Sequence, residues 1–253
     1  MSVILETNGL SRRFGGLRAV GNVTFALQDG ARQALIGPNG AGKTTYINLL
    51  TGVVPPSEGR ITFLGEDITR LSPEARVRRG IVRTFQINQL FDEMTPLEAV
   101  ALAVLERDGK ARAMWRPLAS HHEALDEAAG LLASLGLADA MEVPTAEISY
   151  GRRRLLEICV ALACRPRLLL LDEPAAGVPE HERNDIMNTV ANLPRTVSVL
   201  LIEHDMDLVF RFAERIAVLV GGELLVEGTP DEVANDIRVK EAYLGESLDA
   251  PAA

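Results

Sequence analysis

The stretch Gly37-Pro38-Asn39-Gly40-Ala41-Gly42-Lys43-Thr44 fits the pattern G-x-x-x-x-G-K-[ST], in which each fixed position has a phosphate-binding reason. Glycines let the backbone curl so that consecutive N–H groups converge on one anion, and a helix predicted over Lys43–Gly52 adds its positive dipole end. We expect Lys43 to reach the β- and γ-phosphates, and Thr44 to offer its hydroxyl to Mg²⁺, which prefers hard oxygen ligands. The stretch therefore predicts a nucleoside triphosphate site.

The alternative is a chance match in a glycine-containing turn. The sequence around the stretch argues against it, because Arg32–Ile36 is typical of a short buried strand that enters the loop. The following helix has an apolar face, made by Tyr46, Ile47, Leu49 and Leu50. Strand, glycine loop and helix are the setting that phosphate binding requires, so we favour that interpretation.

The composition is that of an ordinary globular chain, with 253 residues of which 47% are hydrophobic and 24% charged, enough for one large domain or two small ones. A formal charge of −9 does not favour a nucleic-acid partner. Cys159 and Cys164 lie inside a helical pattern, which suits neither a disulfide framework nor a zinc site and fits a reducing compartment. No apolar run approaches the roughly 18 residues of a membrane span, so we expect no insertion by the chain itself.

The order of predicted elements indicates an α/β fold. After a β-rich entry and the phosphate-loop helix, the pattern becomes mostly helical from Pro96 to about Arg165, which predicts a helical insertion. Strands then alternate with helices that begin at Glu180 and Asp205, as a parallel sheet requires. The predicted strands are Val3–Thr7, Val23–Leu27, Gln33–Ile36, Gly59–Gly65, Leu168–Leu171, Ser198–Ile202 and Ile216–Val220, and Gly221-Gly222 leads into a hairpin strand over Glu223–Glu227.

Two acidic residues, Asp172 and Glu173, directly follow the four leucines of the strand at Leu168–Leu171. Such a strand is buried on both faces, so the acids lie at its carboxyl end, which is the usual ligand edge of an α/β sheet. Asp172 is placed for Mg²⁺, and Glu173 is placed to orient or deprotonate an attacking water. The alternative is that two acids merely end a buried strand at the surface.

A third element is Ile148-Ser149-Tyr150-Gly151, followed by Arg152, Arg153 and Arg154, at the start of an amphipathic helix. Ser149 suits an N-cap. Three arginines in a first turn oppose the helix dipole, so an anion or an acidic surface is expected to answer them, and a phosphate near Ser149 and Gly151 would do so. Solvated arginines are the alternative.

In their order and spacing, these three elements resemble an ATP-binding subunit of the ABC transporter family over nearly the whole chain. The resemblance implies a P-loop NTPase fold, an ABC-type nucleotide-binding domain with a mixed β-sheet core, an antiparallel β subdomain and a helical insertion. It implies one domain over residues 1–253, with its core in 1–85 and 166–253 and the insertion in 86–165. By the same resemblance, the nucleotide-binding residues are Phe14, Gly37, Pro38, Asn39, Gly40, Ala41, Gly42, Lys43, Thr44, Thr45, Ser149 and Gly151; the catalytic residues are Lys43, Gln86, Glu173 and His204; and the Mg²⁺ ligands are Thr44, Gln86 and Asp172.

The resemblance also implies a mechanism and partners. Two such domains sandwich two ATP molecules head to tail, each held by the phosphate loop of one protomer and by Ser149 and Gly151 of the other. Gln86 senses the γ-phosphate and links the core to the helical insertion, where two transmembrane permease subunits dock. The chain is then a peripheral subunit at the cytoplasmic face of the inner membrane, served indirectly by an extracytoplasmic solute-binding protein.

A narrower resemblance rests on Arg83–Thr95, on Asp172–Gly177 and on Ala242-Tyr243-Leu244-Gly245. These stretches are similar to those of ATPases that serve importers of branched-chain amino acids and of amides or urea. The chain departs from the family at Arg152, where glutamine is usual, and at Pro179, where aspartate or asparagine is usual. The second departure leaves open an asymmetric pair with a different ATPase subunit.

Two other function classes stay open from the sequence. One is a soluble ABC ATPase without a transporter, such as an iron–sulfur assembly factor, which co-purification with permeases would discriminate. The other is a nucleotide-switched regulatory module with weak hydrolysis, suggested by Pro179 and Arg152; intact Glu173 and His204 weigh against it.

Overall fold

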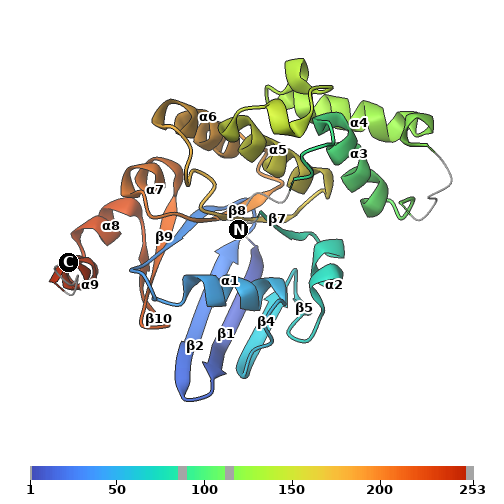
Figure 1. Ribbon diagram of the computed structural model, residues 1–253. Helices are drawn as coiled ribbons and strands as arrows, with labels where there is room; N and C mark the ends of the chain where they lie inside the picture. Colours follow the sequence, from blue (N-terminus) through green and yellow to red (C-terminus); the bar gives the residue numbers. More distant parts are fainter. Residues whose placement is uncertain (1, 85–89, 112–116, 249–253) are drawn as a thin grey trace. The chain divides into compact units, whose positions relative to one another are not determined.

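The computed structural model describes residues 2–84, 90–111 and 117–248. By its internal contacts the chain divides into two compact units, one made of Met1–Arg76 with Pro194–Ala253 and the other of Val77–Leu193 (Figure 1). The predicted insertion over 86–165 lies within the second unit, which also holds a strand before it and a strand after it.

An antiparallel sheet of the first unit has the strand order β2-β1-β4-β5. Its strands are β1 (Val3–Phe14), β2 (Leu17–Gln28), β4 (Glu58–Phe63) and β5 (Glu66–Asp67). The first two are longer than predicted, because the ladder continues past Asn8-Gly9 with a register shift between Thr7 and Leu10. The Asn8-Gly9 dipeptide, which often forms a turn, lies at an irregularity inside a long hairpin instead.

The central strands of the first unit are parallel and fully buried. β3 (Arg32–Ile36) pairs with β8 (Ser198–Ile202) on one side and with β9 (Arg215–Val220) on the other, and β10 (Glu223–Gly228) runs antiparallel to β9. Every residue of β3 and β8 is buried, as expected for parallel strands covered on both faces. The prediction of a mixed sheet is confirmed.

The helix α1 (Lys43–Thr51) packs against the antiparallel hairpin through Tyr46, which is 1% exposed. The Tyr46 hydroxyl lies 3.1 Å from Thr7 Oγ1, and its ring meets Phe25 edge to face at 6.2 Å between centroids. Burial raises the pKa of Tyr46. This anchoring fixes where the helix begins, and therefore where its N-terminal amides point.

The C-terminal end of α1 is capped by Arg76 from α2 (Pro73–Arg78). Its guanidinium donates to the carbonyls of Leu49 and Leu50 at 2.6 and 2.8 Å, which is the favourable end of the helix dipole for a cation. The side chain is almost fully buried, and desolvation lowers its pKa to about 10. The described residues of this unit also form the helices α7 (Met206–Phe212), α8 (Pro230–Asn235) and α9 (Ile237–Leu248).

The second unit is mostly helical. It contains the parallel pair β6 (Ile81–Arg83) and β7 (Leu168–Asp172), and the helices α3 (Pro96–Arg107), α4 (His122–Ser134), α5 (Tyr150–Ala163) and α6 (Glu180–Ala191). Between them lie short 3₁₀ turns at Leu118–Ser120, Ala138–Ala140 and Thr145–Glu147. The sequence did not predict β5, β6, α2, α8 or α9.

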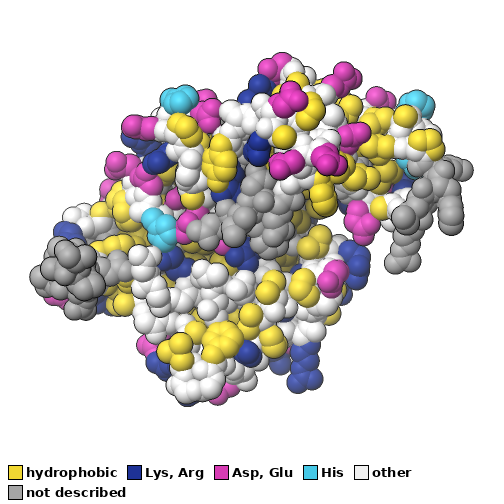
Figure 2. Space-filling view, viewed as in Figure 1, with side chains coloured by type: hydrophobic (Ala, Val, Ile, Leu, Met, Phe, Trp, Pro, Cys, Tyr) yellow, Lys and Arg dark blue, Asp and Glu magenta, His cyan; other side chains and the backbone are white. Residues whose placement is uncertain are grey.

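A hydrophobic core joins α3, α4 and α5, and it includes Val104, Leu132 and Leu156. At its edge, Arg107 donates to both carboxylate oxygens of Glu127 and to the carbonyl that ends α5. These hydrogen bonds raise the pKa of Arg107 and lower that of Glu127. Some hydrophobic side chains in the region of α3 and α4 also reach the surface (Figure 2).

Candidate functional site

The glycine loop between β3 and α1 has a backbone that only glycine allows at two points. Gly37 has a φ of 153° and Gly42 a φ of 97°, and an added Cβ would lie 2.0 Å from the carbonyl oxygen of Leu219 and 2.4 Å from that of Ala19 respectively. Gly42 is the N-cap of α1; no side chain caps this helix, and its described first turn holds no acid. A glycine N-cap with neither a side-chain cap nor an acid in the first turn is typical of a phosphate loop, in which the first-turn amides bind an anion.

Lys43 is 8% exposed, and its ammonium group is bound by the loop itself. Nζ donates to the carbonyls of Gly37 at 2.5 Å and Pro38 at 3.0 Å. Gly37, Pro38 and Ala41 are buried, Gly42 and Thr45 are half-buried, and Asn39, Gly40 and Thr44 are exposed. The lysine is thus held beside the exposed part of the loop.

His204 follows the strand next to β3. Because Leu35 pairs with Ile202 in parallel register, Gly37 and His204 both lie just past the carboxyl ends of neighbouring strands, which is the ligand edge of an α/β sheet. His204 is exposed, and its backbone N–H donates to the Glu203 carboxylate at 3.2 Å.

Phe14, predicted to stack on adenine, ends β1 and is 45% exposed. The guanidinium carbon of Arg12 lies 4.6 Å from its ring centroid. One face of the ring is therefore supported by a cation, an arrangement that keeps the ring at the surface of the first unit. The role of Arg12 was not anticipated from the sequence.

In the second unit, Asp172 ends the buried strand β7 and is itself 5% exposed. Its Oδ2 accepts a hydrogen bond of 2.5 Å from Arg83 of the neighbouring strand β6, and both side chains are about nine-tenths buried. Glu173 follows with a φ of 50°, a conformation that non-glycine residues rarely adopt and that concentrates at functional sites. The sequence does not predict that Arg83 contacts Asp172, because the short strand that carries Arg83 has no distinctive pattern.

The start of α5 carries Ser149 and Gly151. Ser149 is the N-cap, and its Oγ accepts from the Arg152 amide at 3.4 Å, as predicted for an N-cap. The same hydroxyl donates to Glu182 Oε1 at 3.2 Å, and the Gly151 N–H donates to Glu182 Oε2 at 3.0 Å. The carboxylate of Glu182, in the first turn of α6, thus covers the start of α5.

The three arginines of this turn form hydrogen bonds with carboxylates and carbonyls of the same chain. Arg152 forms a two-pronged pair with Asp139, which lowers the pKa of that carboxyl, and Arg154 donates to Glu157 at 2.8 Å. Arg153 donates to the carbonyls of Ala146 and Ile148. Arg153 also lies 3.5 Å from Asp92 Oδ1, so the expectation that acidic groups oppose these arginines is confirmed for all three.

The first unit brings together the glycine loop, Phe14 and His204, and the second holds Ser149, Gly151, Asp172 and Glu173. Gln86 lies outside the described residues. Over the part of the chain that the structure describes, no helix combines the length and apolar character needed to cross a membrane.

Comparison with known proteins agrees with this arrangement. Residues 20–176 match the family model described as ABC transporter, and residues 223–249 match the one described as branched-chain amino acid ATP-binding cassette transporter. The high-affinity branched-chain amino acid transport ATP-binding proteins BraF of Pseudomonas aeruginosa and LivG of Escherichia coli are 41% and 39% identical, each over 96% of this chain and 98% of its own length.

Among solved structures, the ADP conformation of MJ1267, an ATP-binding cassette of an ABC transporter, is similar with a TM-score of 0.84 and 33% identity, over 97% of this chain and all of that one. The predicted P-loop fold of the ABC type is confirmed. The chain therefore belongs to the ABC transporter family, as a subunit that binds and hydrolyses ATP.

Proposed function

We propose that this chain is the ATPase subunit that energises an importer of branched-chain amino acids. The observation that carries the proposal is the whole-length similarity to BraF and LivG, together with the match of residues 223–249 to the branched-chain amino acid model. The transported solute is recognised by other subunits of such an assembly, so the role of this chain is to convert ATP binding and hydrolysis into work.

In this function the first unit holds the nucleotide. Phe14 stacks on adenine, with Arg12 on the ring as its support. The amides of Gly37–Thr45 bind the phosphates at the start of α1, and Lys43 exchanges its loop carbonyls for β- and γ-phosphate oxygens. Buried Lys43 needs little rearrangement for this exchange, because its stem is already packed in the loop.

Mg²⁺ fits the donors that this chain offers. Thr44 has an exposed hydroxyl and Asp172 a carboxylate, and Gln86 completes the expected set; all are hard oxygen ligands. Arg83 holds one oxygen of Asp172, so the carboxylate is oriented before any ion arrives. When bound, the ion would neutralise charge that develops on the transferred phosphoryl group.

Hydrolysis then depends on Glu173 and His204. Glu173 orients the attacking water, and its positive φ holds the side chain at the end of β7. His204 contacts the γ-phosphate from the ligand edge that it shares with the glycine loop. Catalysis of this kind is mainly positioning and electrostatic stabilisation.

A second ATPase protomer, identical or different, completes each site. Ser149 and Gly151 of one protomer bind the nucleotide that the glycine loop of the other holds, through one hydroxyl and one backbone amide. A single chain therefore carries two incomplete halves, and hydrolysis requires the pair.

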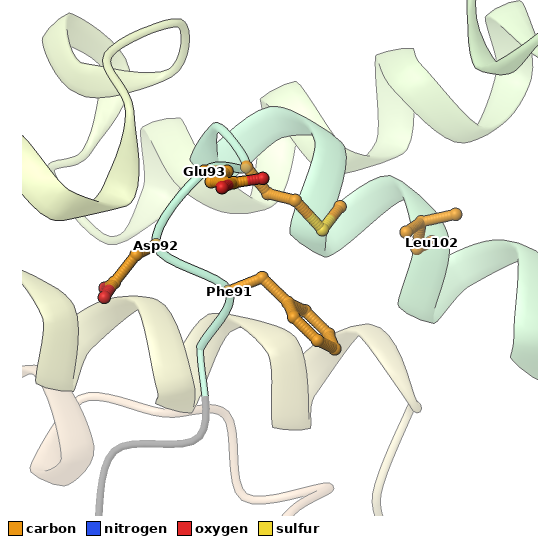
Figure 3. A pocket seen from close by; sticks show the side chains of 5 residues that line it. Phe91, Asp92, Glu93 and Leu102 are labelled. Carbon is orange, nitrogen blue, oxygen red and sulfur yellow. The ribbon is translucent and has the colours of Figure 1, made fainter.

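Of the two permease subunits, one docks on the helical unit of each ATPase protomer, at a surface pocket of about 530 Å³ lined by Phe91, Asp92, Glu93, Met94 and Leu102. Figure 3 shows the Phe91 ring and the Leu102 side chain bordering an open space, while the Asp92 carboxylate points away. Phe91 is 70% exposed and Leu102 42% exposed. Exposed apolar pockets of this kind mark binding sites for other proteins. Phe91, which lines the pocket, follows Gln86 by only a few residues in the sequence, so a permease bound at the pocket would contact the segment that leads to the γ-phosphate sensor.

The proposal is tested by pulling down the tagged chain from detergent-solubilised native membranes, with ATPase and leucine-uptake assays on the reconstituted eluate. Two hydrophobic permeases and ATP-dependent leucine uptake are expected. Phe91→Asp should lose the permeases but keep ATP binding, whereas Val53→Asp, at an exposed apolar position of the other unit, should keep both. A soluble partner set without permeases would contradict the importer and favour a soluble ABC ATPase.

A further inference from the structure

The start of α5 is covered by an anion that belongs to the chain. The two carboxylate oxygens of half-buried Glu182 accept from the Ser149 hydroxyl at 3.2 Å and from the Gly151 amide at 3.0 Å. The approach is so close that a Cβ at Gly151 would lie 2.1 Å from Glu182 Oε2. The donors that our proposed function assigns to a phosphate are therefore already bound to a carboxylate.

The sequence of α6 explains why Glu182 reaches across to another helix. It is the third residue after the N-cap Pro179, and a glutamate at this place ordinarily accepts a hydrogen bond from the N–H of the N-cap residue. In α3, Glu98 makes that bond with the Thr95 amide at 2.9 Å, and α8 has the same arrangement. Proline has no N–H. Glu182 lacks its usual partner within α6 and bonds to α5, which packs beside α6 (Figure 1).

A carboxylate and a phosphate accept hydrogen bonds from the same donors, and one amide and one hydroxyl cannot serve both at full strength. We propose that Glu182 is an internal competitor of the triphosphate, which must leave Ser149 and Gly151 before the nucleotide of the second protomer can bind there. Glu182 thereby sets the ATP concentration at which the pair closes. This inference rests on the proposed function, since it takes from it the role of Ser149 and Gly151.

Glu182 acts through other residues and is therefore a positioning residue. Its effect is on closure of the pair, and it takes no part in the attack on the γ-phosphate. The kinetic signature is a change in the KM for ATP that is larger than the change in kcat. Pro179 contributes to the same effect, because it has no N–H that could bind the Glu182 carboxylate within α6.

The test uses the transporter purified through the tagged chain, with ATPase activity measured against ATP concentration. Glu182→Gln keeps the size of the side chain and removes its charge; it should lower the KM for ATP about tenfold, which corresponds to ~1.4 kcal/mol, with a smaller change in kcat. Glu180→Gln removes the same charge from an exposed position of the same turn and should leave both constants unchanged. Pro179→Thr supplies an N–H and a capping hydroxyl, and should lower the KM while Glu182 is kept.

Amide hydrogen exchange of the isolated chain reports on the contact itself. Exchange in residues 149–154 should speed up in Glu182→Gln and in Pro179→Thr, but not in Glu180→Gln. An unchanged or raised KM in Glu182→Gln, or equal effects of the two glutamine variants, would overturn the inference. If Gly151→Asp leaves the ATPase of the transporter intact, the proposed role of the α5 start is wrong, and this outcome is separate from any result at Glu182.

Discussion

The starts of α1 and α5 both offer backbone amides to phosphate in the proposed function, but the chain prepares them differently. At α1, the N-cap is a glycine, no side chain caps the described helix, and the nearby Lys43 is cationic. At α5, Ser149 caps the helix and the carboxylate of Glu182 lies on the donors. One start follows a loop whose shape depends on glycines, and the other is covered by a carboxylate of the chain itself.

Because of this difference, we expect the α1 start to provide the affinity for nucleotide and the α5 start to control closure of the pair. A helix start with a neighbouring cation and no acid in its described first turn binds phosphate without first displacing a carboxylate of that turn. A helix start covered by a carboxylate binds phosphate only after an exchange, so its affinity is lower and adjustable. We therefore expect nucleotide to bind first at α1, and closure onto α5 of the second protomer to be the regulated step.

The largest effect is expected from a substitution at Glu173, which should strongly slow cleavage of the γ-phosphate without affecting the binding of ATP. Glu173→Gln should leave ATP binding at both helix starts intact, while turnover falls by roughly the 10²–10⁴ attributed to a positioned acid or base. ATP binding by fluorescence titration and turnover by phosphate release would measure the two quantities. Near-normal turnover would show that another group orients the water.

The second prediction compares a glycine-to-alanine substitution at the start of α1 with the same substitution at the start of α5. Gly42→Ala forces a Cβ to within 2.4 Å of the Ala19 carbonyl oxygen at a φ of 97°, so we expect a loss of about 3 kcal/mol in the free energy of unfolding and no ATP binding. Gly151→Ala lies in a helix, and the nearest atoms that its Cβ would meet outside that helix belong to the Glu182 side chain, which can move aside, so the unfolding free energy should change by less than about 1 kcal/mol. Urea unfolding would compare them, and equal losses would contradict the distinction.

The third prediction concerns the other end of α5, where Arg107 binds Glu127 and the Ala163 carbonyl. Arg107→Met should lower the free energy of unfolding by about 2 kcal/mol at pH 7, the usual size for hydrogen bonds to a charged group. Since Arg107 lowers the folded pKa of Glu127, that stability is present above the ordinary value of 4.5 and is lost as the pH falls through the folded pKa. Unfolding at several pH values should therefore show the two proteins converging in acid; a constant gap would assign the effect to packing.

Much of this fold could be predicted from the sequence, because its central elements have strong local patterns. The glycine loop, the four leucines before Asp172 and the strand at Ser198–Ile202 each carry a distinctive pattern and lie where predicted. The strand Ile81–Arg83 has only three residues, too few to show a periodic pattern, so it was missed. Because this strand was not predicted, the contact by which its residue Arg83 orients Asp172 was not predicted either.

The contact of Glu182 with the start of α5 could not have been predicted, since the two segments are 31 to 33 residues apart. Only the packing of α6 beside α5 brings them together. The sequence did contain part of the signal, because Pro179 departs from the family pattern at the residue that would otherwise hold Glu182 within its own helix. An unusual N-cap followed by a glutamate at the third helical position is a pattern that can be searched for in other chains.

The central claim is that the phosphate held at α1 of one protomer is completed by α5 of the other, and the most direct measurement is the ATPase activity of a mixture of Lys43→Ala and Gly151→Asp chains. Each variant alone should be inactive. A mixed pair has one complete site, formed by the glycine loop of the Gly151→Asp chain and the α5 start of the Lys43→Ala chain, so an equal mixture should recover up to about a quarter of the wild-type activity. A mixture in which mixed pairs are shown to form, yet no activity returns, would contradict the account.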